Sequence, residues 1–149
     1  MFNRNEERYL ESIADSLKKI ARDLEPKVLS SLAIQFYIGG SMSTAAVTLI
    51  VGQSTVATVT GTDQFGNPFT PLPAISWSID QPTLDSITAD ATPPAEDVTS
   101  LAVGTANLTA SATNAASATV SVTGVITNVP VPPPTPVLTT LTMSLSTPA

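Results

Sequence analysis

Carboxylates are the only side chains outside the first 27 residues that could do acid–base or metal chemistry. The sequence contains no histidine and no cysteine, so it offers neither an imidazole nor a thiolate. All six lysines and arginines lie within residues 1–27, which leaves the serine-rich remainder without a base that could activate a hydroxyl. Glu96 and Asp97 are adjacent, so they point apart in an extended chain and are expected to be solvated. We expect no catalytic residues and no enzyme.

Metal and cofactor sites are not expected either. Asp80 and Asp85 flank the sequence QPTL, where a Ca²⁺ ion could bind with help from Asp63 or Asp90, but no EF-hand-like spacing supports such a site. The Gly39-Gly40 pair is not followed by the lysine of a phosphate-binding loop. The sequence therefore predicts no metal ligands and no cofactor.

The charge is divided unevenly along the chain. Residues 1–27 hold six acids beside the six bases, whereas residues 28–149 hold six acids and no base, so the net charge of −6 belongs to the second part. A surface without lysine or arginine repels nucleic acid and anionic lipid. The highly charged N-terminus lacks the apolar core of a signal peptide, and the apolar-rich residues 28–38 are too short to span a membrane. We expect no nucleic-acid binding and no membrane span.

Residues 4–25 have the pattern of an amphipathic helix that ends before Pro26. Apolar residues recur with 3-4-3-4 spacing, at positions a and d of a heptad, and Ala14 and Ala21 widen this face. Leucine at a with isoleucine at d favours three or four strands, so we expect a homo-oligomer, with a trimer favoured. Docking on a larger partner and packing on the protein's own β domain are alternatives. The predicted interface residues are Leu10, Ile13, Leu17, Ile20 and Leu24.

The rest of the chain is predicted to be mainly β. Residues 28–41 are expected to connect the helical segment (1–27) to a β-sandwich (42–126), although alternation at Ile34, Phe36 and Ile38 allows a short strand. Strands are expected over 44–51, 55–63, 74–80, 83–90, 106–113 and 117–125, with a hairpin turn at Gly66-Asn67-Pro68 and a loop over 92–97. Trp77 is expected to fill the core between two sheets.

Residues 127–149 are expected to form a proline-rich spacer followed by one strand. The segment TNVPVPPPTP is extended and semi-rigid by composition. The strand after it could return to the sandwich or add to the edge of a neighbouring subunit. Its predicted interface residues are Val137, Leu141, Met143 and Leu145.

Four short motifs, in order, carry a resemblance to a known family. They are Gly52-Gln53, Asp63 with Gly66-Asn67-Pro68, Trp77-Ser78, and Gly104-Thr105-Ala106 with Leu108-Thr109. Through them residues 43–125 resemble the bacterial Ig-like domains of group 2, the invasin/intimin-like type. The resemblance implies an Ig-like β-sandwich. The acidic stretch ADATPPAEDVTS departs from the family, which usually has a tight turn there.

The resemblance also suggests a role. Modules of this family serve as spacers and adhesive units in bacterial surface proteins, and they decorate phage heads and tails. Because no export signal is visible, we expect a phage virion structural protein, a head decoration or short head-fibre protein, that is assembled in the host cytoplasm and binds capsid or other virion proteins. Weak binding to a host surface is an added expectation. The alternatives are an adhesive or spacer module of a bacterial surface protein and a phage tail or baseplate accessory protein.

Overall fold

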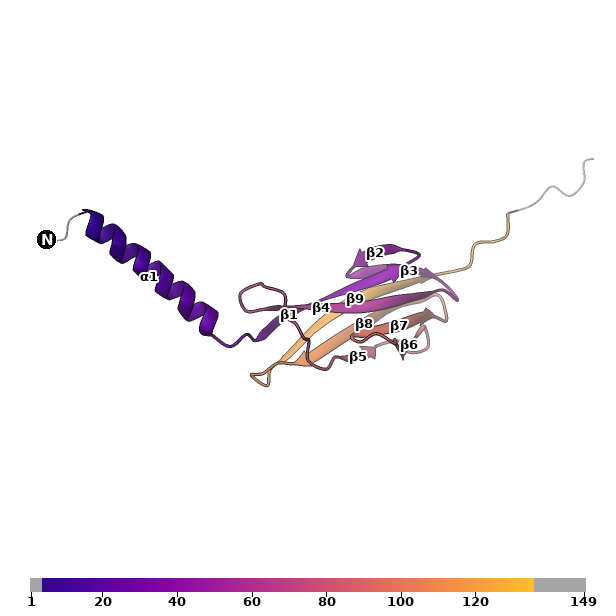
Figure 1. Ribbon diagram of the computed structural model, residues 1–149. Coiled ribbons are helices and arrows are strands. Elements are labelled where there is room, and N and C mark those ends of the chain that lie inside the picture. The colour runs from indigo at the N-terminus through magenta and orange to yellow at the C-terminus, as the bar shows by residue number, and fades with distance from the viewer. Residues whose placement is uncertain (1–3, 136–149) are drawn as a thin grey trace, which may run out of the picture.

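Figure 1 shows the computed structural model, which describes residues 4–135 as one helix followed by two β-sheets. The helix expected over 4–25 is confirmed, and so is the mainly β character of the chain after it. The elements are α1 (Arg4–Leu24), β1 (Leu29–Ile38), β2 (Ser41–Thr44), β3 (Ala46–Ile50), β4 (Ser54–Asp63), β5 (Ser76–Ile79), β6 (Asp85–Ala89), β7 (Ala95–Ser100), β8 (Gly104–Thr113) and β9 (Thr119–Val129).

The strands form a five-stranded sheet, β2-β1-β4-β7-β6, and a four-stranded sheet, β3-β9-β8-β5. Neighbouring strands are antiparallel except β3 and β9, which run parallel. The chain enters the sheets at Leu29, which pairs with Asp63, and leaves them at Val129, which pairs with Ile50. A tight turn joins Ile50 to Ser54, so entry and exit lie at opposite ends of the ten-residue strand β4. Figure 1 shows α1 and the C-terminal segment leaving the sheets in opposite directions.

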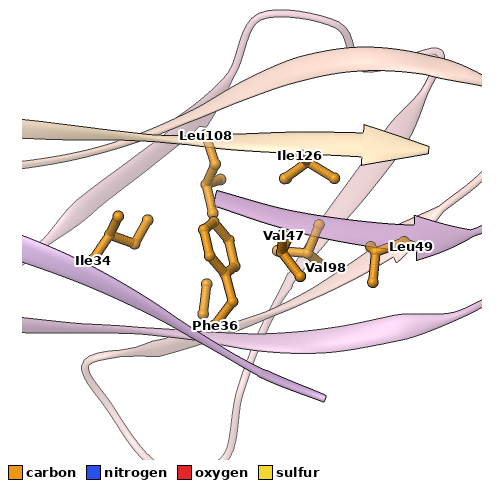
Figure 2. Close-up of a cluster of buried hydrophobic side chains, with 8 residues drawn as sticks. Ile34, Phe36, Val47, Leu49, Val98, Leu108 and Ile126 are labelled. Carbon is orange, nitrogen blue, oxygen red and sulfur yellow. The ribbon is translucent and has the colours of Figure 1, made fainter. Parts of the chain in front are cut away.

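The two sheets pack face to face, because alternate residues of each strand point into a shared core. Phe36 of β1 is fully buried at its centre, and Figure 2 shows its ring between side chains from both sheets. Gly124 of β9 makes room for this ring, since a Cβ there would lie 2.7 Å from Phe36 Cζ. The cluster consists of Ile34, Phe36, Val47, Leu49, Ala57, Val98, Leu108 and Ile126.

The prediction that residues 28–41 only connect the helix to the sandwich is wrong. This segment forms β1, which pairs with β2 on one side and β4 on the other, and it buries Ile34 and Phe36 in the core. The sandwich therefore begins at Leu29 and not at residue 42. The alternation seen in the sequence is the physical reason, because it gives the segment one apolar face that only a sheet covers.

The strand expected over 44–51 is confirmed as β3, and a further strand, β2, precedes it in the other sheet. β2 ends at Thr44 and β3 begins at Ala46, with Ala45 between them at a φ of 65°. This left-handed conformation is uncommon for a residue with a side chain, and it turns the chain from one sheet to the other. The N–H of Ala45 donates to Ile34 O, and its carbonyl accepts from Val125 N, which ties the crossing to both sheets.

The turn at Gly66-Asn67-Pro68 does not join a hairpin of β4 and β5, because these strands lie in different sheets. The chain turns back only far enough for Thr62 to face Pro68 in a single bridge, and then crosses over. Prolines 68, 71 and 73 lack the N–H that a continued ladder needs. The expected loop over 92–97 is also shorter, because β7 begins at Ala95.

Candidate functional site

The apolar face of α1 is uncovered. No described residue of the helix is buried, and the five predicted interface side chains are between 52 and 78% exposed. Their spacing places them along one face, which we call the helix stripe. Contiguous exposed apolar surface of this kind marks an interaction site in soluble proteins. The helix stripe consists of Leu10, Ile13, Leu17, Ile20 and Leu24.

The residues beside the helix stripe favour close packing. Ala14 and Ala21 follow the stripe along one edge, and their small side chains allow another backbone to approach. An ion pair within α1 joins Lys18 Nζ to Asp15 Oδ1 at 3.8 Å, and both side chains are about four-fifths exposed. Such a pair contributes little to stability. The helix therefore offers a partner mainly apolar surface.

Gln64 fixes the segment that joins α1 to the sheets. Its Oε1 accepts a hydrogen bond from Val28 N at 2.7 Å, and its Nε2 donates to Pro26 O at 3.0 Å. Both bonds cross 36 or more positions of sequence, so they tie the exit of the helix to the turn after β4. These two hydrogen bonds therefore hold the segment through which α1, with its helix stripe, is attached to the sheets.

The turn that carries Gln64 is itself held by Asp63. Its Oδ1 accepts from the backbone N–H groups of Phe65 at 2.9 Å and Asn67 at 2.8 Å. Burial raises the pKa of the Asp63 carboxyl, but the hydrogen bonds from Asn67 and Phe65 and the charge of Lys27 bring that pKa below its ordinary value of 3.8. The carboxyl is ionised at neutral pH and keeps the turn closed. Phe65, at the tip of this turn, is 36% exposed.

A second open surface is a groove of about 630 Å³ beside β4, β5 and the crossing between them. Asp90 and Glu96 lie at its rim, and burial followed by the nearby charges of Asp97 and Asp90 raises the pKa of Glu96. The lining of the groove is mainly apolar and includes the carboxylates of Asp90 and Glu96, which fits a binding surface better than a catalytic site. Its apolar lining includes Phe69, Leu72, Ile75, Trp77, Pro93 and Pro94.

Trp77 contacts the core on one side and lines the groove on the other. It packs against both core clusters, as expected of a residue between the sheets, yet it is only partly buried because one side faces the groove. The indole thus joins the core to the open surface. The sequence pattern identified Trp77 but not the groove, whose signal is the alternation of apolar residues and prolines in FTPLPAI.

The other predicted interface residues, Val137, Leu141, Met143 and Leu145, lie outside the described residues. The part of the proline-rich spacer that the structure describes, residues 130–135, is exposed and comes after β9 without regular structure. It leaves the sandwich at the end opposite α1 (Figure 1).

The aspartates considered for Ca²⁺ do not gather. Asp63 closes its own turn, Asp80 accepts from Asn107 N and Nδ2 at 2.7 Å each, and Asp90 accepts from Thr92 N. These bonds from Asn107 lower the pKa of Asp80. Within residues 4–135 no three His, Cys, Asp or Glu side chains come close enough to hold a metal ion together. In the same residues no helix has the length and apolar character needed to cross a membrane.

Comparisons with known proteins find a similar fold among solved structures, but no match to a family model or to a curated protein. The crystal structure of domains 4 and 5 of the S-layer protein SbsC is similar with a TM-score of 0.53 at 20% identity, over 70% of this chain and 54% of that one. The structure of SbsC domains 1–6 gives a TM-score of 0.54 at 21% identity, over 72% of this chain and 14% of that one.

These similarities show the fold alone. The chain spans about half the length of the two-domain SbsC structure, and less of the longer one. The fold of the sandwich therefore also occurs in the S-layer protein SbsC. The resemblance to group 2 bacterial Ig-like domains stays a prediction.

Proposed function

We propose that this chain is a non-catalytic structural protein of a phage virion, a head decoration or short head-fibre protein. In this proposal α1 joins copies of the chain, or docks them on the shell, and the sandwich, an Ig-like domain, projects outward. The observation that carries the proposal is the helix stripe, whose five large apolar side chains are all at least half exposed. Exposing such a surface to water is unfavourable, so another apolar surface is expected to cover it.

Self-association is the simplest way to cover the helix stripe. The spacing repeats every seven residues, and leucine at a with isoleucine at d favours three or four helices, of which we take a trimer. Residues 1–27 carry six acids and six bases, so identical helices approach without net repulsion.

The sandwich has the opposite charge behaviour. It carries acids without any base, so neighbouring sandwiches repel one another at neutral pH. Copies gathered through α1 therefore hold their sandwiches apart. This combination of an associating base and mutually repelling heads supports display on a particle surface.

The path of the chain supports a sandwich that lies in line between the segments before and after it. α1 enters at one end of the sandwich and the proline-rich segment leaves at the other, so the module adds its whole length between the segments that flank it (Figure 1). In the proposal the strand predicted after this spacer pairs either with its own sandwich or with a neighbouring subunit.

The association is tested by placing a charge in the helix stripe. Leu17→Glu puts a carboxylate at an a position, and Ser12→Glu adds the same charge at a c position away from the stripe. Light scattering is expected to give a trimer for the parent and for Ser12→Glu, and a monomer for Leu17→Glu. A trimer that survives Leu17→Glu would remove α1 as the associating element.

The virion setting is tested separately. We expect mass spectrometry of purified particles of a phage that encodes the chain to find it, and deletion of residues 1–27 to abolish its incorporation. Particles that incorporate the truncated chain would contradict the anchoring role.

The second candidate is a spacer or adhesive module of a bacterial surface protein. The fold shared with S-layer SbsC domains and the entry and exit at opposite ends favour it. It predicts the chain in the cell-envelope fraction of uninfected bacteria, where the first candidate predicts none.

A further inference from the structure

A carboxylate is buried between the two sheets at the end of the sandwich remote from α1. Asp85 of β6 is 0% exposed, and it pairs in register with Ser100 of β7, which is 1% exposed. Asn128 of β9, 2% exposed, reaches it from the other sheet, and its Nδ2 donates to Asp85 Oδ1 at 2.9 Å and to Leu84 O at 3.2 Å. Three strands from both sheets thus meet at one polar cluster.

Each residue of this cluster has an oxygen without a hydrogen-bond partner in the described structure. These atoms are Asp85 Oδ2, Ser100 Oγ and Asn128 Oδ1, all buried. Buried polar atoms are normally paired, because leaving one unpaired forfeits the hydration that it had in the unfolded chain. All three oxygens belong to residues that meet around one carboxylate, and carboxylate, hydroxyl and amide oxygens are ligands that a hard cation prefers.

No side chain of the sandwich can balance the charge of Asp85. The sequence has no lysine or arginine after residue 27, and Lys27 lies near Asp63, at the far end of β4. Ser100 lies at the opposite end of β4, beside the turn that precedes this strand, where its N–H donates to Gln53 O. A buried carboxylate without a cationic partner is costly, so something other than a side chain has to neutralise it.

We propose that Asp85, Ser100 and Asn128 bind a Ca²⁺ ion through their unpartnered oxygens. Asp85 supplies the charge, and the hydroxyl and amide oxygens add neutral ligands of the kind found in calcium sites. Because the ligands come from β6 and β7 of one sheet and β9 of the other, the ion fastens the sheets together. It does so where β9 leaves the sandwich, one residue before its last residue, Val129.

A proton is the competing way to neutralise Asp85. Burial raises the pKa of its carboxyl, and the hydrogen bond from Asn128 only partly offsets this. A protonated carboxyl needs no metal and turns Oδ2 into a donor. The two possibilities differ in what they make stability depend on, calcium or pH.

The test measures the thermal unfolding midpoint of the full chain in chelator and in excess CaCl₂, together with a calorimetric titration by Ca²⁺. We expect one ion per chain and a rise in the midpoint of about 4 °C or more. Asp85→Asn keeps the shape of the side chain and should lose the rise, and Ser100→Ala should weaken the affinity. Asp80→Asn, a matched change at an exposed aspartate, should keep the rise.

Two results would overturn the site. A midpoint unmoved by Ca²⁺, but falling as pH rises in the parent and not in Asp85→Asn, would assign a proton to Asp85. A rise that Asp85→Asn retains would place the ion elsewhere. Neither result bears on the helix stripe, since Asp85 lies at the other end of the sandwich.

Discussion

The helix and the sandwich differ in whether their apolar side chains are covered within the chain. No described residue of α1 is buried, whereas Phe36, Leu49, Leu108 and Ile126 of the sandwich are fully buried within the chain itself. The sandwich thus carries its own partner for every apolar face in the core, and α1 does not. We therefore expect the sandwich to be stable alone and the stability of α1 to depend on association.

The largest expected effect comes from the core. Phe36→Ala removes a fully buried ring that both sheets contact, so the free energy of unfolding should fall by about 3–5 kcal/mol. Tyr37→Ala is the matched control, because the next side chain points away from the core and is 42% exposed. Chemical denaturation measures both. A loss below about 1 kcal/mol for Phe36→Ala would contradict the observed core.

The second effect concerns the concentration dependence of α1. About 21 residues with fewer than three heptads form a marginal helix in isolation, so the helical circular dichroism signal should fall on dilution. The near-ultraviolet signal of Trp77, which reports the sandwich, should stay constant. Leu17→Ala should move the loss to higher concentration. A helical signal independent of concentration would mean that α1 needs no partner.

A smaller effect is expected at the joint between the two regions. Gln64→Ala removes both hydrogen bonds that hold Pro26 and Val28, and because the bonds are exposed the sandwich should lose only about 1 kcal/mol. The clearer result should be motion. NMR relaxation should show α1 reorienting more independently of the sandwich. Relaxation equal to that of the parent would show that Gln64 does not hold the joint.

The smallest effect is expected in acid. The pKa of Asp63 in the folded protein lies below its ordinary value of 3.8, so the stability that this carboxylate contributes is present above 3.8 and lost as pH falls further. Asp63→Asn should reduce the stability at neutral pH and flatten this acid loss. Unfolding curves from pH 5 to pH 2 measure it, and an unchanged acid slope in the variant would assign the loss to other carboxylates.

Local patterns predicted the features that depend on local sequence. The spacing of five apolar residues located α1, and alternation located the centres of most strands, because both signals come from the period of one element. The helix stripe was predicted residue by residue for the same reason. The exposure of these side chains was not, since the sequence allowed packing on the β domain as well.

The pairing of strands that lie far apart in the sequence could not be predicted from local sequence patterns. Ile34 and Phe36 alternate visibly, but nothing near them shows that β1 lies between β2 and β4 in the sheet. The turn after Asp63 has the residues of a hairpin, and only the prolines beyond it explain why β5 joins the other sheet. The full burial of Asp85 was not predicted either, because aspartates are mostly exposed and the neighbouring sequence does not show which strand covers this one.

The central claim is that α1 associates and the sandwich does not. The most direct measurement is the mass in solution, by light scattering, of the full chain and of residues 28–149 at equal concentration. We predict a trimer that becomes a folded monomer when residues 1–27 are removed. A monomer in both cases, or an assembly that survives the truncation, would contradict the claim.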